Sequence, residues 1–157
     1  QDSDSLYKRA LNGGEGKYGF IDIIKNYKGT TAAKLATYSA GMAYLNIKDY
    51  QNAIAYLNQF NSEDVLLGAL AKGAIGDAFA QMGQLEEAFD YYVTASNINN
   101  NMYSTPKFLY KAAMIGSKLG KDSQALTYLE RIDKEFKESQ EANMVAVQIA
   151  KLKSILK

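Results

Sequence analysis

Apolar residues recur at three- and four-residue intervals along almost the whole chain, which is the period of an α-helix. One apolar stripe spans residues 36–47 and the next spans 54–60, with the polar segment 48–50 between them. This pattern predicts two amphipathic helices joined by a tight turn. The arrangement returns around residues 83–84 and again around 120–122, so we expect an all-α protein.

The predicted helical pairs form a repeat. Three alanines that follow the three turns, Ala53, Ala88 and Ala125, lie 35 and 37 residues apart. A period slightly above 34 residues is typical of stacked helix–turn–helix units. Small residues are needed where helices cross closely, and the first helix of each unit has one at the equivalent position: Gly41, Gly76 and Ala113.

These features resemble the tetratricopeptide (TPR) repeat, which combines a small residue, an aromatic residue, a glycine-led turn and an alanine at fixed positions. The resemblance places repeats at 34–67, 69–102 and 106–139. It implies a right-handed α-solenoid, in which residues 1–33 form an N-terminal half-repeat cap and residues 140–157 form a C-terminal capping helix.

Several local signals predict where the helices begin and turn. Thr30 or Thr31 is expected to cap the first helix of repeat one, Thr105–Pro106 to begin the first helix of repeat three, and Ser139 to cap the final helix. Lys48 occupies a turn position that is glycine in the other repeats, so we expect a left-handed backbone there. In the final helix, one apolar stripe should face inward: Val145, Ile149, Leu152 and Leu156.

In TPR proteins the first helices of the repeats line a concave groove, and the resemblance implies that this groove binds a partner segment. We expect two sets of residues to contact the partner. One set occupies groove positions of the repeat pattern, and the other is a stripe of lysines on the first helix of repeat three. They are Tyr38, Met42, Leu45, Asn46, Asp77, Gln81, Lys107, Tyr110, Lys111, Met114 and Lys118.

The lysine stripe suggests the chemistry of the partner. Lys107, Lys111 and Lys118 lie within about 40° of one another on a helix, and three like charges favour an acidic peptide or a C-terminal carboxylate as the ligand. A solvated lysine face is the alternative interpretation. For the apolar candidates the alternative is ordinary packing between helices, and it applies to Tyr38, Met42, Leu45, Tyr110 and Met114.

Composition narrows the function classes. The chain of 157 residues has a formal net charge of +1 and contains neither histidine nor cysteine, which excludes Ser–His and Cys–His nucleophile pairs, thiol chemistry and imidazole or thiolate zinc sites. General nucleic-acid binders carry a large excess of basic residues, and this chain has no such excess. The glycine-rich segment 13–17 lacks a glycine and the Ser/Thr of a phosphate loop, and the asparagines of 97–101 are not followed by the glycine and carboxylate of a calcium loop. We therefore predict a non-catalytic protein with no cofactor, metal ion or nucleic-acid ligand.

A looser resemblance bears on location. Residues 27–30, 40–45 and 76–79 are similar to bacterial envelope TPR proteins of the YfgM type, which are ancillary translocon subunits. That resemblance implies a location in the bacterial cell envelope through a membrane anchor upstream of Gln1, with the cytoplasm as the alternative. The function we expect is a protein-binding scaffold, and a homodimer that binds no peptide is the alternative.

Overall fold

The computed structural model describes residues 2–61 and 63–157. Within these residues the chain forms nine α-helices and no β-strand. In chain order the helices are α1 (Ser3–Asn12), α2 (Phe20–Asn26), α3 (Thr31–Asn46), α4 (Tyr50–Gln59), α5 (Val65–Gln81), α6 (Leu85–Ile98), α7 (Ser104–Lys118), α8 (Asp122–Glu135) and α9 (Ala142–Ile155).

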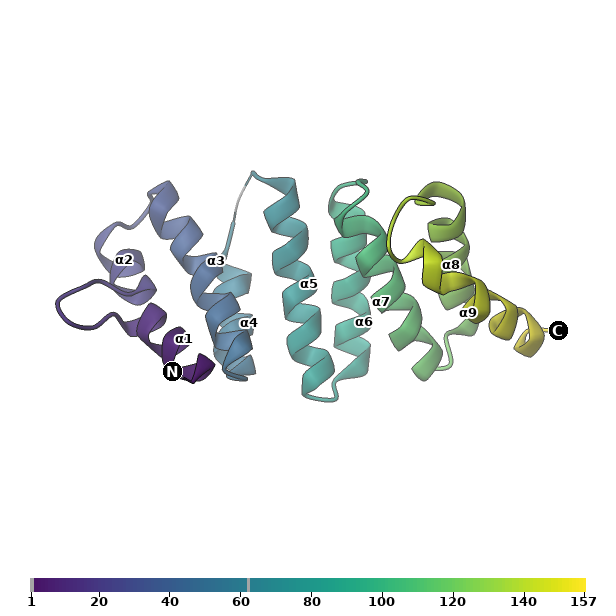
Figure 1. Cartoon of the computed structure of the whole chain (residues 1–157), viewed down its shortest axis with the longest axis horizontal. Helices are drawn as coiled ribbons and strands as arrows, with labels where there is room; N and C mark the ends of the chain where they lie inside the picture. Colours follow the sequence, from purple (N-terminus) through teal and green to yellow (C-terminus); the bar gives the residue numbers. More distant parts are fainter. Residues whose placement is uncertain (1, 62) are drawn as a thin grey trace.

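The helices stack in the order of the sequence, with the two chain ends at opposite ends of the stack (Figure 1). Each helix packs against the next one along the chain, and α3 and α7 also contact α5. In Figure 1, helices α3, α5, α7 and α9 form the near layer, and the fainter α4 and α8 lie behind it. Helix pairs that contact only their neighbours are the architecture of an all-α solenoid, so the predicted fold class is confirmed. No helix in the described part of the chain is long and apolar enough to cross a membrane.

The predicted close helix crossings are present. A Cβ atom added to Gly41 would lie 2.6 Å from Cγ of Leu57 on α4, and one added to Gly76 would lie 2.7 Å from Cε1 of Tyr92 on α6. The third position, Ala113, is completely buried between α7 and α8. Small residues therefore allow the first helix of each pair to approach the large side chains of the second.

The turns between paired helices have the predicted backbone. Gly83 and Gly120 have φ angles of 76° and 74°, and Lys48 has a φ of 63° at the equivalent place. The prediction of a left-handed lysine is confirmed. A residue with a Cβ atom is disfavoured in this region by about 1 kcal/mol, whereas glycine adopts it freely.

Replacing Lys48 with glycine should therefore leave stability unchanged or raise the free energy of unfolding by up to about 1 kcal/mol, because the relief of strain is partly offset by the greater freedom of the unfolded chain. Urea denaturation measures the effect. Lys34→Gly, at an exposed position inside α3, is the matched control and should cost about 1 kcal/mol. A similar loss for Lys48→Gly would contradict the assignment of strain to this turn.

Of the three predicted helix caps, Thr30 is confirmed, Ser139 bonds the first residue of α9 although Glu141 is the N-cap, and Thr105 is wrong. The Thr30 hydroxyl accepts a hydrogen bond from the Ala33 N–H at 3.1 Å, and the Ser139 hydroxyl accepts one from the Ala142 N–H at 3.2 Å. Thr105–Pro106 does not begin α7, which starts one residue earlier. Asn101 Oδ1 is the acceptor at this end instead: it accepts from the N–H of Tyr103, just before the helix, and from the N–H of Ser104, its first residue.

Three of the four residues of the apolar stripe predicted for the final helix face inward. Val145 and Leu152 are buried against α7 and α8, and Ile149 packs beside them. Leu156 is 44% exposed and lies beyond the last helical residue, Ile155, so its predicted burial is wrong. The helical period does not extend past the point where the helix ends.

Candidate functional site

A central cavity of about 540 Å³ opens where three consecutive helix pairs meet. The end of α3, the turn after it and the start of α4 line this cavity together with the end of α5 and with one residue each of α6 and α7. Its lining residues are Leu45, Asn46, Lys48, Tyr50, Asp77, Ala80, Gln81, Tyr92 and Lys111. Five of the predicted contact residues are therefore brought together here: Leu45, Asn46, Asp77, Gln81 and Lys111.

Three of the lining residues form a polar cluster that joins three helices. Asp77 Oδ1 on α5 accepts a hydrogen bond from the Tyr92 hydroxyl on α6 at 2.6 Å. The same oxygen forms an ion pair with Lys111 Nζ on α7 at 2.5 Å. The Lys111 ammonium also lies 5.4 Å from the centre of the Tyr92 ring. The cluster links α5, α6 and α7 through one carboxylate oxygen, and it partly neutralises the lysine that the sequence suggested for an acidic ligand.

The Tyr92 phenol is held in its protonated form. Burial of the ring, followed by the hydrogen bond to Asp77 and the negative charge of Asp77, raises the pKa of Tyr92 far above its usual value. An unfolded tyrosine loses its proton from about pH 10 upward, whereas folded Tyr92 keeps it. The unfolded state then binds fewer protons than the folded state, so the Tyr92 contribution to stability is complete below pH 10 and falls as pH rises above it.

Tyr92→Phe should therefore reduce the loss of stability at alkaline pH. Each pH unit above 10 lowers the free energy of unfolding of the natural protein by up to about 1.4 kcal/mol through this group, and phenylalanine removes that dependence. Urea denaturation at several pH values measures it, with Tyr103→Phe as the control because Tyr103 is 83% exposed. Identical pH profiles for Tyr92→Phe and Tyr103→Phe would refute the role of Tyr92.

Comparison with known families identifies two of the helix pairs around the cavity. The sequence model of the tetratricopeptide repeat matches residues 36–63 and 69–102. Both stretches are tetratricopeptide repeats. No curated protein matches the chain. TPR repeats generally mediate protein–protein interactions, and the family is generally a non-catalytic scaffold fold.

The two matched repeats supply most of the central cavity. Within the described residues, Lys111 of α7 is the one lining residue outside them. The structure adds three lining residues that the sequence prediction missed: Lys48, Tyr50 and Tyr92. Tyr92 belongs to the second helix of its repeat, and its hydroxyl reaches Asp77 because Gly76 lets the ring approach α5 closely.

The predicted lysine stripe is divided among different surroundings. Lys111 is paired with Asp77, as described above. Lys107 lines a separate cavity together with Glu138 and Glu141, and its ammonium lies 5.7 Å from the Phe108 ring. Lys118 is exposed at the end of α7. The three ammonium groups therefore do not share one ligand-binding surface around the central cavity.

The remaining predicted residues take part in packing between helix pairs. Tyr38 contacts the Phe60 ring at a centroid distance of 5.2 Å, and Met42 packs beside it on the same hydrophobic cluster. Tyr110 and Met114 pack against the cluster that α7 forms with α8 and α9. These four side chains are half-buried, which is the arrangement expected from the packing alternative.

The described residues contain no group of histidine, cysteine, aspartate or glutamate side chains that could hold a metal ion. The glycine-rich segment between α1 and α2 is closed by hydrogen bonds between Gly14 and Lys17 and by an ion pair of 2.7 Å from Arg9 to Glu15. The polar side chains of the central cavity can donate and accept hydrogen bonds and can offer charge to a ligand.

Proposed function

We propose that this chain is a scaffold that binds an extended segment of a partner protein across its central cavity. The observation that carries the proposal is that one cavity is lined by side chains of three consecutive helix pairs. An extended peptide is long and narrow, and a surface that crosses several stacked repeats can contact several of its residues in succession.

The side chains in the cavity suit a peptide backbone and a carboxylate. Asn46 and Gln81 occupy equivalent places at the ends of α3 and α5, and a side-chain amide can donate to a backbone carbonyl and accept from a backbone N–H. Within the described residues no ion pair holds Lys48, so its ammonium can meet a carboxylate of the partner. The apolar contact surface comes from Leu45, Tyr50 and Ala80.

Selection of a phage-displayed library of random dodecapeptides on the immobilised chain tests this proposal. Gln81→Trp places a large ring in the cavity, and Gln51→Trp makes the same change on the exposed surface of α4. Peptides enriched on the natural chain should bind Gln51→Trp unchanged and Gln81→Trp at least about tenfold more weakly. Equal binding to both variants, or no enriched peptide, would reject the central cavity as the binding site.

Self-association is the second candidate function, because α9 leaves apolar side chains uncovered at the end of the stack. Val147 is 76% exposed, and Met144 and Ile155 are also exposed. Light scattering of the chain and of Val147→Glu distinguishes the two functions. A dimer that Val147→Glu converts to a monomer, together with no peptide binding, would favour self-association.

We also propose that this scaffold acts in a membrane-associated complex of the bacterial envelope. The support is the similarity of residues 27–30, 40–45 and 76–79 to envelope TPR proteins. Fractionation of cells that express the full-length gene tests it. Recovery in the soluble cytoplasmic fraction would favour the cytoplasmic alternative.

A further inference from the structure

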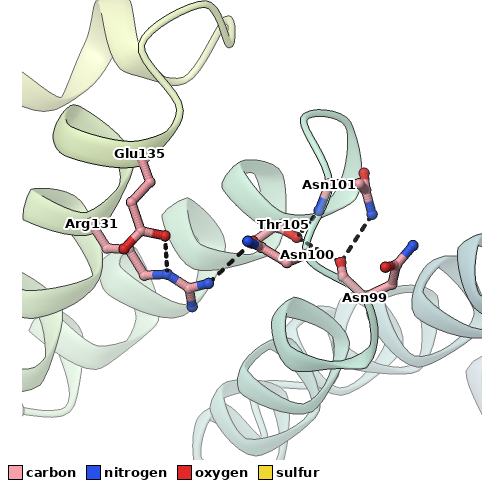
Figure 2. A network of polar contacts seen from close by, with 6 residues as sticks. All are labelled: Asn99, Asn100, Asn101, Thr105, Arg131 and Glu135. Carbon is pink, nitrogen blue, oxygen red and sulfur yellow. Dashed lines mark hydrogen bonds and ion pairs between the residues drawn. The ribbon is translucent and has the colours of Figure 1, made fainter.

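The loop between α6 and α7 is held in place by an unusually complete set of side-chain hydrogen bonds (Figure 2). Asn101 Oδ1 accepts from the N–H groups of Tyr103 and Ser104, both at 2.8 Å, and Asn101 Nδ2 donates to the Asn99 carbonyl at 3.0 Å. The Thr105 hydroxyl accepts from the Asn101 N–H and donates to the same Asn99 carbonyl. The loop backbone is therefore fixed before any ligand arrives.

This rigid loop exposes two large apolar side chains. Tyr103 is 83% exposed and Met102 is 40% exposed, although the backbone N–H of Tyr103 is held by Asn101 Oδ1. They form one wall of a cavity of about 600 Å³, which we call the loop-edge cavity. Its lining residues are Met102, Tyr103, Lys107, Glu138, Ser139, Gln140 and Glu141.

The opposite wall is the turn between α8 and α9, and it is also fixed. The buried Ser139 side chain holds the start of α9 through the Ala142 N–H. Arg131 ties the two walls together, because its Nη2 donates to Asn100 Oδ1 at 3.2 Å (Figure 2). Its guanidinium also lies 5.8 Å from the centre of the buried Phe136 ring. The shape of the loop-edge cavity thus depends on contacts that are already made.

The charges in this cavity indicate the chemistry of its ligand. Two glutamates, Glu138 and Glu141, line this cavity together with one lysine, Lys107, whose ammonium lies 5.7 Å from the centre of the Phe108 ring. No ion pair within residues 2–61 and 63–157 holds either glutamate. Carboxylates beside an exposed aromatic ring attract a cation through charge and through the ring face together.

We propose that the loop-edge cavity is a second interaction surface, and that it binds a protein segment carrying an arginine or lysine next to an apolar residue. The cationic side chain lies between the Tyr103 ring and the carboxylates of Glu138 and Glu141, and the apolar neighbour packs on Met102. Tyrosine is a frequent anchor at interfaces because its ring gives a large contact area with few rotatable bonds. The proposal is independent of the central cavity, which has different lining residues.

Nuclear magnetic resonance titration of the ¹⁵N-labelled chain tests this surface. The probe is the peptide acetyl-Leu-Arg-Ala-Leu-Arg-amide, compared with the same peptide containing citrulline in place of arginine, which keeps the shape and removes the charge. The arginine peptide should shift the amide signals of residues 102–104 and 138–141. The citrulline peptide should bind at least about tenfold more weakly.

Two variants and their matched controls locate the contacts. Tyr103→Ala and the double change Glu138→Gln with Glu141→Gln should each weaken binding of the arginine peptide by about five- to tenfold. Tyr18→Ala and Glu87→Gln change an exposed tyrosine and an exposed glutamate elsewhere and should leave binding unchanged. The proposal is overturned if the variants bind as the natural chain does, if the citrulline peptide binds equally well, or if no signal near the cavity moves. Signal shifts confined to the residues that line the central cavity would also overturn the proposal, because no signal near the loop-edge cavity would then move.

Discussion

Replacing Gly73 with alanine should destabilise the protein by about 1 to 3 kcal/mol or more, although alanine is the better helix former. A Cβ atom at Gly73 would overlap the ring of Phe108, which is only 2% exposed between α5 and α7. The ring has little room to move, because it also stacks on Tyr92 at a centroid distance of 6.4 Å. Thermal and urea denaturation measure the loss.

A second glycine of the same helix provides the control. Gly68 also lies within α5, but a Cβ atom there would meet no atom within 4 Å. Gly68→Ala should therefore raise the free energy of unfolding by about 0.5 to 1 kcal/mol, because alanine restricts the unfolded chain and favours the helix. Opposite signs for Gly68→Ala and Gly73→Ala would separate the steric effect from helix propensity.

A double-mutant cycle assigns the steric effect to one contact. Phe108→Ala alone should cost about 3 to 5 kcal/mol, because it leaves a cavity in the buried cluster of α5, α6 and α7. In that background Gly73→Ala should cost nothing further or should stabilise, since the ring that it would strike is gone. Additive losses in the double variant would mean that Gly73 is needed for another reason.

The fold was predictable from sequence because its determinants are local and periodic. A helix crossing needs a small residue at one fixed place, and Gly41 and Gly76 appear at that place with the repeat period. The left-handed turn at Lys48 could also be predicted, since the two equivalent turns contain glycine. When the same steric requirement recurs with the repeat period, the residues that meet it can be recognised in the sequence.

The candidate site was predicted less completely because its parts depend on contacts between helices. The lysine stripe is a property of one helix, but Asp77 of the neighbouring repeat pairs with Lys111 and changes what that stripe can bind. The Tyr92 hydroxyl comes from a helix that the repeat pattern assigns to the other layer. Asn101 caps α7 from outside the usual cap position, which the Thr105–Pro106 signal obscured.

Asp77→Ala should lower the free energy of unfolding by about 1 to 3 kcal/mol, because it leaves the Tyr92 hydroxyl and the Lys111 ammonium without their shared acceptor. Asp77→Asn should cost less, since an amide oxygen still accepts a hydrogen bond from Tyr92. Lys111→Met should cost about 1 kcal/mol or less, because the ion pair is partly exposed and water screens it. Urea denaturation of the three variants measures this order.

Although Asp77→Asn should lower stability, it should strengthen the binding of an acidic peptide. In Asp77→Asn the Lys111 ammonium is no longer neutralised, so the central cavity gains positive charge beside Lys48. A peptide with a carboxylate that binds this cavity should therefore bind Asp77→Asn several-fold more tightly, and the gain should shrink at high salt. Glu87→Asn, which removes a charge from an exposed position on α6, controls for the change in net charge. An equal gain in both variants would show that overall charge, and not the release of Lys111, determines the affinity.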